Sequence, residues 1–295
     1  MTQRVDVAVV GGGILGLAFA WEAARRGKSV ALFERSGVAS GASVRNFGMV
    51  WPIGQVPGAD YARAMRSRER WLELKAEAGV WAEECGSLHV AHADDEDAVL
   101  REFVSANPGV ACAHLTAAET RWRFPAVNPE GLRGALHSPT ELAVNPPAAI
   151  ARIPHFLAEK YGVRLHFNTT VTGIDAPQLR TAGGETWTAS RIFVCSGSDF
   201  ETLFPAVFAS SGIHRCKLQM MKSAPQPGGW RIGPHLAGGL TLCHYKAFDA
   251  CPSLPALKQR VAETMPECVR FGIHVMASQN DRGEVIIGDS HEYDA

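Results

Sequence analysis

A membrane-spanning helix needs about 20 consecutive apolar residues, and the sequence lacks any run of that length. The apolar stretch over residues 7–21 contains three consecutive glycines and follows Asp6, which is not typical of a signal peptide. Paired cysteine motifs are lacking too, because the seven cysteines include no C-x-x-C pair. We therefore expect neither a zinc site nor a disulfide framework, but reduced, mostly structural cysteines in a cytoplasmic protein.

An excess of charge of one sign is lacking as well. The 295 residues include 29 Lys and Arg against 30 Asp and Glu, so the formal net charge is −1. A chain this close to neutral has no electrostatic footprint for nucleic acid or an anionic membrane. The apolar share of 46% is ordinary for a packed protein, and the length is that of one large or two smaller structural units.

The beginning of the chain has the order strand, glycine turn, helix, strand and acid. Residues 5–10 are β-branched and predict a strand buried on both faces, residues 17–26 predict a helix that ends at Gly27, and residues 28–33 predict a second strand. The glycine turn G-G-G-I-L-G lies between the first strand and the helix, and Glu34 follows the second strand. In such a unit the glycines admit a pyrophosphate at the helix N-terminus, and the acid binds a ribose hydroxyl. The order therefore predicts a dinucleotide-binding site.

The segment after Glu34 bears on the choice of dinucleotide. The acid disfavours NADP but does not separate NAD from FAD. Residues 40–49, S-G-A-S-V-R-N-F-G-M, form a small, polar, glycine-punctuated loop where an NAD dehydrogenase would enter another helix. With these motifs the chain resembles the D-amino-acid-oxidase-like family of FAD-dependent amine oxidoreductases over residues 5–289. Residues 45–55, R-N-F-G-M-V-W-P-I-G-Q, are similar to a branch of its short bacterial members found beside phosphonate-degradation genes.

The resemblance implies FAD as the cofactor and assigns roles to individual positions. Val171 matches the position whose backbone contacts the adenine, and Ser196 and Gly197 match a small-residue turn against the pyrophosphate. Asn46 and Phe47 are expected to line the isoalloxazine. The residues expected to bind FAD are Gly11, Gly13, Ile14, Gly16, Glu34, Arg35, Ala42, Ser43, Asn46, Phe47, Gly48, Val171, Ser196 and Gly197.

From residue 211 the pattern indicates strands without helices, over residues 214–221, 240–246, 272–278 and 283–287. Arg215 and Lys217 would share one face, where cations suit a carboxylate or phosphonate. Adjacent residues on a strand point opposite ways, and His244 is favoured over Tyr245 as the residue facing the flavin. We expect His244 and Arg45 to be catalytic, Arg215, Lys217, Tyr245 and His291 to bind substrate, and no residue to bind metal.

The order of elements predicts an α/β protein with a Rossmann-type FAD-binding domain, built on a parallel sheet, and an α+β substrate domain with a mixed or antiparallel sheet. Residues 1–78 and 145–210 are assigned to the first domain, and residues 79–144 and 211–287 to the second. In the family, residues matching 288–295 begin a further FAD-domain segment of helix, strand and helix. The resemblance therefore implies a C-terminally truncated form of a longer protein.

The activity that the resemblance implies is oxidation of the C–N bond of a small amine, namely an amino acid, an N-methyl amine or an aminophosphonate. Hydride would pass to flavin N5, the imine would hydrolyse in water, and oxygen or a quinone would accept the electrons. Two alternatives remain open at this point. One is an NAD-dependent dehydrogenase, against which the loop over residues 40–48 argues. The other is an inactive, truncated flavoprotein fragment.

Overall fold

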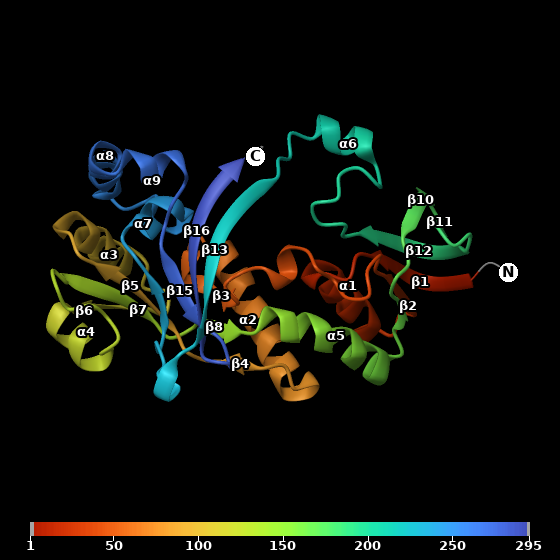
Figure 1. Ribbon diagram of the computed structural model, residues 1–295, viewed down its shortest axis with the longest axis horizontal. Coiled ribbons are helices and arrows are strands. Elements are labelled where there is room, and N and C mark those ends of the chain that lie inside the picture. Colours follow the sequence, from red (N-terminus) through yellow and green to blue (C-terminus); the bar gives the residue numbers. More distant parts are fainter. Residues whose placement is uncertain (1–2, 294–295) are drawn as a thin grey trace. The chain divides into compact units, whose positions relative to one another are not determined.

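The structure, a computed structural model, describes residues 3–293, and the chain divides into two compact units (Figure 1). The first unit comprises the residues up to Asn46, Ala76–Val80 and Pro146–Arg215. The second comprises Phe47–Lys75, Trp81–Asn145 and the residues from Cys216 onward. Residues 47–75, which the sequence analysis assigned to the FAD-binding domain, thus group with the second unit. One reason is that Met49 and Val50 pair with a strand of that unit.

The first unit has a six-stranded sheet in the order β10-β11-β12-β1-β2-β9. Its central strand β1 is parallel to β12 and β2, and β2 is parallel to β9, whereas β10 and β11 form antiparallel pairs. The strands are β1 (Gln3–Val10), β2 (Val30–Phe33), β9 (Arg164–His166), β10 (Val171–Asp175), β11 (Gln178–Thr181) and β12 (Thr186–Val194). The helices are α1 (Ile14–Arg25), α5 (Pro146–Tyr161) and α6 (Pro205–Ser210), with a 3-10 turn η1 (Ala42–Val44).

Apolar spacing explains this unit. All four residues of β2 are buried, as expected for a parallel strand covered on both faces. Helix α1 buries Leu17, Ala20, Trp21 and Ala24, which lie on one stripe at helical spacing, and it packs against α5. The helix ends where predicted, because Gly27 adopts a left-handed φ of 72° and its N–H donates to the carbonyl of Ala24.

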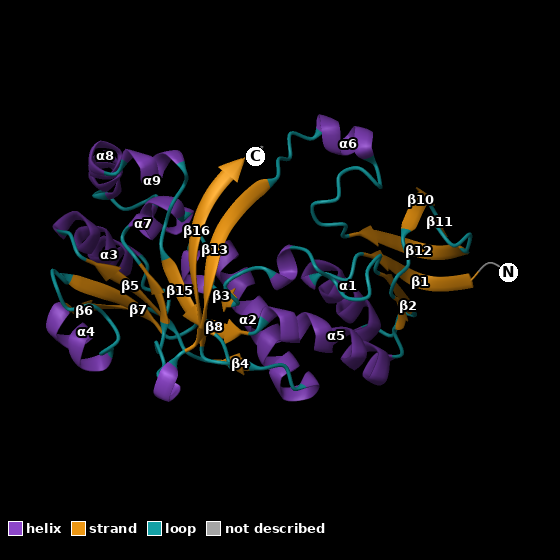
Figure 2. Cartoon of the chain, viewed as in Figure 1, coloured by secondary structure: helices purple, strands orange, loops and turns teal. Residues whose placement is uncertain are grey.

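The second unit has a seven-stranded sheet in the order β13-β16-β15-β14-β5-β7-β6 and a three-stranded sheet in the order β3-β8-β4. Its longest strands, β13 and β16, run side by side and antiparallel (Figure 2). The strands are β3 (Met49–Val50), β4 (Ala82–Glu83), β5 (Ser87–Ala91), β6 (Ala113–Thr116), β7 (Gly134–Ser138), β8 (Leu142–Val144), β13 (Cys216–Pro225), β14 (His235–Ala237), β15 (Met276–Gln279) and β16 (Glu284–Tyr293). The helices are α2 (Ala59–Ala78, whose last residues belong to the first unit), α3 (Asp94–Ala106), α4 (Ala117–Arg123), α7 (Leu240–His244), α8 (Leu254–Thr264) and α9 (Pro266–Arg270), with 3-10 turns η2 (Pro52–Gly54), η3 (Pro227–Gly229) and η4 (Lys246–Phe248).

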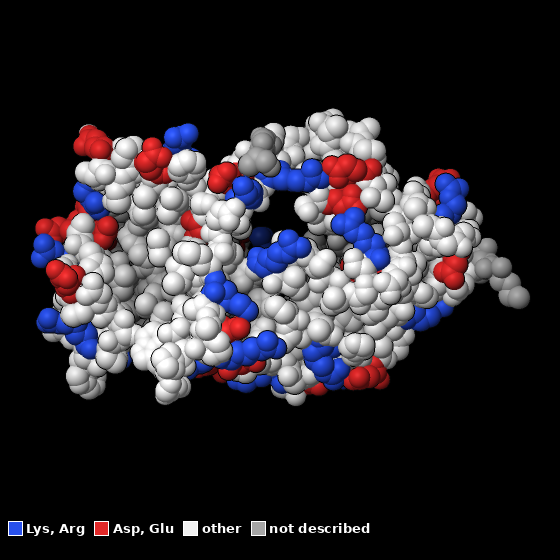
Figure 3. Space-filling view, viewed as in Figure 1, with Lys and Arg blue, Asp and Glu red and all other residues white. Residues whose placement is uncertain are grey.

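Helices α3, α7 and α8 contribute to one buried core of this unit, together with residues of β5 and β7. Phe103, Leu242, Phe248 and Leu257 are among its fully buried side chains. None of the helices in residues 3–293 combines the length and the apolar character needed to cross a bilayer. On the face seen in Figure 3, basic and acidic side chains are interspersed on a mostly uncharged surface.

Several predictions for the second unit were wrong. Residues 240–244 form helix α7 rather than a strand, because Thr241 and Leu242 are buried in the core as part of a short helix. Helices α8 and α9 also interrupt the expected run of strands. An apolar alternation over seven residues is too short to separate a strand from a helix. Residues 288–293, expected to begin another FAD-domain segment, continue β16.

Candidate cofactor-binding site

The glycine turn between β1 and α1 can be built only from glycine at two positions. Gly11 has a φ of 107°, and a Cβ there would clash with the carbonyl oxygen of Cys195. A Cβ on Gly16 would clash with the carbonyl oxygen of Gly11. The turn therefore packs against the end of β12 on one side and against α1 on the other. This is the close backbone geometry that a pyrophosphate site requires.

Glu34 lies at the end of β2 and is only 8% exposed. Its carboxylate accepts hydrogen bonds from the Gly12 N–H at 2.8 Å and from the Ser36 N–H at 2.9 Å. These hydrogen bonds hold the Glu34 carboxylate against the glycine turn. Beside the first turn of α1, the Ser43 hydroxyl accepts the Ile14 N–H at 3.0 Å.

A cavity of about 400 Å³ opens at this edge of the first unit's sheet. Small residues and backbone form much of its wall, which leaves room for an elongated polar ligand beside the N-terminus of α1. Ten of the predicted FAD-binding residues line it, namely Gly11, Gly13, Ile14, Glu34, Arg35, Ala42, Ser43, Val171, Ser196 and Gly197.

Four predicted FAD-binding residues do not line this cavity. Gly16 packs within the turn instead. The Asn46 amide donates to the carbonyl oxygens of Ala42 and Ser43 at 3.0 and 3.2 Å, so it braces the loop from within. The Phe47 carbonyl accepts the Ser278 hydroxyl at 2.6 Å, and the Gly48 carbonyl accepts the Val144 N–H at 2.8 Å. Their roles toward FAD stay predictions.

The sequence analysis missed Asp199 and the polar residues Thr169, Thr170 and Thr202, which also line the cavity. Asp199 forms an ion pair with Arg35 at 2.7 Å and accepts the Thr202 hydroxyl at 2.7 Å. Burial opposes the charge on Asp199, but hydrogen bonds from Thr202 and Glu201 and the Arg35 charge together lower the pKa of its carboxyl. The position of Asp199 just after the Ser196–Gly197 turn is the only sequence signal that could have indicated it.

The predicted cations are engaged in local contacts. Arg45 donates to the Ser40 carbonyl. Arg215 precedes β13, donates to the Ser198 carbonyl at 2.9 Å and pairs with Glu201 at 2.6 Å. Lys217 lies 4.0 Å from a carboxylate oxygen of Glu292. The expected common face of Arg215 and Lys217 is therefore divided between two different acidic partners.

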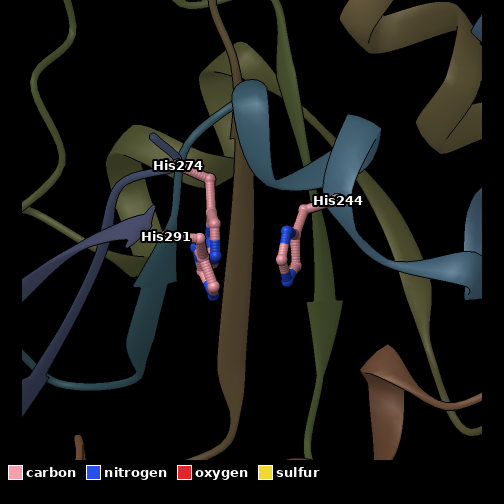
Figure 4. Close-up of side chains that lie close together, drawn as sticks. All are labelled: His244, His274 and His291. Atoms are coloured by element: carbon pink, nitrogen blue, oxygen red, sulfur yellow. The ribbon is translucent and has the colours of Figure 1, made fainter. Parts of the chain in front are cut away.

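His244 and His291, predicted from separate segments, lie together in the second unit with His274, which the sequence analysis did not single out (Figure 4). The adjacent Tyr245 hydroxyl donates to the Met276 sulfur at 3.6 Å. Burial raises the pKa of Tyr245 to about 12, so it is a neutral phenol. The catalytic and substrate-binding roles assigned to these residues stay predictions.

Comparison with known proteins gives a family context. The family model for FAD dependent oxidoreductases (DAO) matches residues 6–295. A glycine oxidase of Geobacillus kaustophilus (strain HTA426) is 30% identical over 242 residues, which cover 77% of this chain and 64% of that protein. A component of the anaerobic glycerol-3-phosphate dehydrogenase of Escherichia coli (strain K12) is 32% identical over 142 residues, covering 47% of this chain and 26% of that protein.

A solved structure, that of L-proline dehydrogenase from P. horikoshii, superimposes with a TM-score of 0.74 at 22% identity, covering 98% of this chain and 70% of that one. Together with the family match, this likeness confirms the predicted fold class. The matched region spans less than two thirds of the glycine oxidase.

Proposed function

Because the chain belongs to the family of FAD dependent oxidoreductases, we propose that the protein oxidises the C–N bond of a small amine or amino acid. Membership decides the cofactor in favour of FAD over NAD, the alternative that the glycine turn alone left open. FAD, when bound, supplies the acceptor for a hydride from the carbon that bears nitrogen. The match covers only 64% of the length of the related glycine oxidase. Similarity to that protein therefore supports the activity as a proposal.

The observation that carries this proposal is the cavity in the first unit. Gly11 and Gly16 leave no room for a side chain, and the Glu34 carboxylate, held by the Gly12 N–H, lines the cavity. The N-terminus of α1 provides N–H groups for a pyrophosphate, and Glu34 accepts from a ribose hydroxyl. Arg35, held by Asp199, places a paired cation in the same wall. The donor, acceptor and charge of these residues suit the pyrophosphate and ribose of FAD.

The finer proposal concerns the substrate. Relatives named glycine oxidase and L-proline dehydrogenase favour a small zwitterion. The similarity of residues 45–55 to the phosphonate-associated branch favours an aminophosphonate or its N-methyl derivative. Either substrate carries an anionic end that a cation such as Arg45 or Lys217 can bind. Oxygen or a quinone is the proposed electron acceptor, and the cytoplasm the proposed compartment.

The test is a flavin spectrum of the purified protein, followed by anaerobic reduction with a panel of substrates. Glycine, L-proline and an aminophosphonate represent C–N donors. Glycerol 3-phosphate represents the C–O donor suggested by the glycerol-3-phosphate dehydrogenase relative. We expect at least one amine to bleach the bound flavin and glycerol 3-phosphate to leave it oxidised. Bleaching by glycerol 3-phosphate alone would contradict the proposal, as would a protein that binds no flavin.

A further inference from the structure

Three histidines that are far apart in the sequence meet in the second unit. His244 ends α7, His274 lies just before β15, and His291 lies on β16. Each offers a ring nitrogen, and these nitrogens all lie within 4.8 Å of one another. The ring centroids are 4.0 Å apart for His244 and His274, and 4.7 Å apart for His244 and His291. Figure 4 shows the three rings side by side.

We propose that His244, His274 and His291 form a binding site for a divalent transition-metal ion of the Zn²⁺ type. Three imidazoles are a donor set that suits Zn²⁺, Co²⁺, Ni²⁺ and Cu²⁺, and not the oxygen-seeking Mg²⁺ and Ca²⁺. The sequence analysis predicted no metal site, because no two of these histidines share a local motif.

His274 provides the first supporting observation, because it is a buried polar side chain without a hydrogen bond. It is 3% exposed, and neither ring nitrogen has a hydrogen-bond partner among the described residues. Its Nε2 lies 3.2 Å from the Asp289 Oδ1, but the two atoms are not aligned as a hydrogen bond. Buried polar groups are normally satisfied, and a metal ion would supply the missing partner.

His291 provides the second observation. Its Nδ1 lies 3.0 Å from the Gly272 carbonyl oxygen, to which the Nδ1–H donates. This bond leaves the Nε2 lone pair free, which is the arrangement that usually orients a metal-binding histidine. The His291 N–H also donates to the Phe271 carbonyl at 2.8 Å. A Cβ at Gly272 would lie 2.9 Å from the His291 Cβ, so only glycine lets the ring approach so closely.

Backbone hydrogen bonds hold His274 opposite Asp289, two residues before His291 on β16. The N–H of Asp289 donates to the His274 carbonyl at 2.9 Å, and the N–H of His274 donates to the Asp289 carbonyl at 3.2 Å. The Asp289 carboxyl is itself 7% exposed. Its Oδ2 lies 4.0 Å from the His291 Nε2. A carboxyl so placed can offset the charge of a bound dication as a fourth ligand or as a neighbour of the ligands.

His244 is the exposed member of the set and stands at the end of a five-residue helix. Metal binding would require its side chain to rotate, so that its nitrogen comes within the about 2.0–2.1 Å of the ion that a Zn–N bond needs. His244 and His274 also line a cavity of about 310 Å³, which gives an ion access.

The test uses the full chain, freed of metal with a chelator and titrated with Zn²⁺ by calorimetry. We expect one Zn²⁺ per chain, and we expect His244→Gln and His274→Gln each to weaken binding by at least about tenfold. His155→Gln, on the exposed face of α5, is the matched control and should bind as the parent does. Should His274→Gln fail to fold, His244→Gln at the exposed position still decides the question.

The cavity beside the cluster is also lined by Cys243 and Cys268, which are the rival ligands. The Co²⁺-loaded protein separates the two sets, because thiolate ligands add a charge-transfer band that imidazoles do not. We expect that band to be absent and Cys243→Ser and Cys268→Ser to leave affinity unchanged. Binding that survives both histidine substitutions, or that is lost only with the cysteines, would overturn the proposal. Flavin content does not enter these measurements, so the site is tested independently of the proposed oxidation.

Discussion

At Gly13 the fold itself has room for a side chain, but a bound pyrophosphate would leave none. The Gly13 φ of −71° is ordinary. An added Cβ would meet only the Ser43 side chain, with the hydroxyl oxygen at 3.0 Å and the Cβ at 3.9 Å. We therefore predict that Gly13→Val removes bound flavin while changing the free energy of unfolding by less than about 1 kcal/mol. The flavin-to-protein ratio and thermal unfolding measure the two effects.

Gly109→Ala is the matched control for that substitution, because an added Cβ there would meet nothing within 4 Å. It should retain both flavin and stability. A Gly13→Val protein that purifies with the parent's flavin content would show that the turn does not contact the cofactor. By contrast, Gly11→Ala should also lose stability, since its backbone φ of 107° is strained for any other residue.

The Glu34 carboxylate both holds the glycine turn and is proposed to bind the ribose of FAD, so its substitution should weaken FAD binding. Its carboxylate holds the Gly12 and Ser36 N–H groups, and the proposed ribose contact adds a charge-assisted hydrogen bond. We predict that Glu34→Ala weakens FAD binding by about 1.5–3 kcal/mol. Glu34→Gln, which keeps one acceptor oxygen, should lose less. Titrating flavin-free protein with FAD and following flavin fluorescence gives both affinities, and equal affinities for parent and Glu34→Ala would rule out the contact.

At the scale of single elements, the capping box of α4 offers a local test. The Thr116 hydroxyl accepts the Glu119 N–H at 3.2 Å, and the Glu119 carboxylate accepts the Thr116 N–H at 2.8 Å. We predict that Thr116→Ala lowers the free energy of unfolding by about 0.5–2 kcal/mol. Denaturant unfolding measures the loss. Restored stability in Thr116→Ser, which keeps the hydroxyl, would confirm the cap as the cause, and an unchanged Thr116→Ala would contradict it.

The elements that the sequence predicted correctly are those whose signals are local. Strand β1, helix α1 and strand β2 follow from apolar spacing, three glycines and an acid within the first 34 residues. Helix α7 was predicted wrongly because it packs against α8, whose residues lie outside the segment over residues 240–246 that carries the alternation. Tertiary packing outweighs a short alternation of this kind.

The same reasoning applies to the side chains that form sites. Most of the cavity lining of the first unit could be predicted, because the turn, the acid and the following loop are contiguous in the sequence. His274 could not, since it meets His244 and His291 only after β15 pairs with β16. Asn46 was assigned to the isoalloxazine from its place in the motif, but a sequence cannot show that its amide turns inward to the carbonyls of its own loop.

At the scale of the whole molecule, buried neutral histidines make stability depend on pH. His89 is 1% exposed, and neither of its ring nitrogens has a hydrogen-bond partner among residues 3–293. It packs against Trp51 and Phe248. Burial lowers its pKa to about 3, and burial also lowers the pKa of His235 to about 4. Both rings belong to the second unit, so acid should act on that unit first.

We predict that the free energy of unfolding of the parent is level above about pH 6.5 and falls below it. The folded pKa of each histidine lies below its unfolded value, so the unfolded chain takes up the proton first as the pH drops. Each such histidine then costs about 1.4 kcal/mol per pH unit until its folded pKa is reached. His89→Leu removes one titrating group and should reduce this slope by the same amount, whereas exposed His155→Gln should leave it unchanged. Denaturant unfolding between about pH 7 and pH 5 measures the slopes. A slope in His89→Leu equal to the parent's would mean that the unfolded and folded chains protonate His89 alike, and hence that the ring is not held in the apolar surroundings that Trp51 and Phe248 provide.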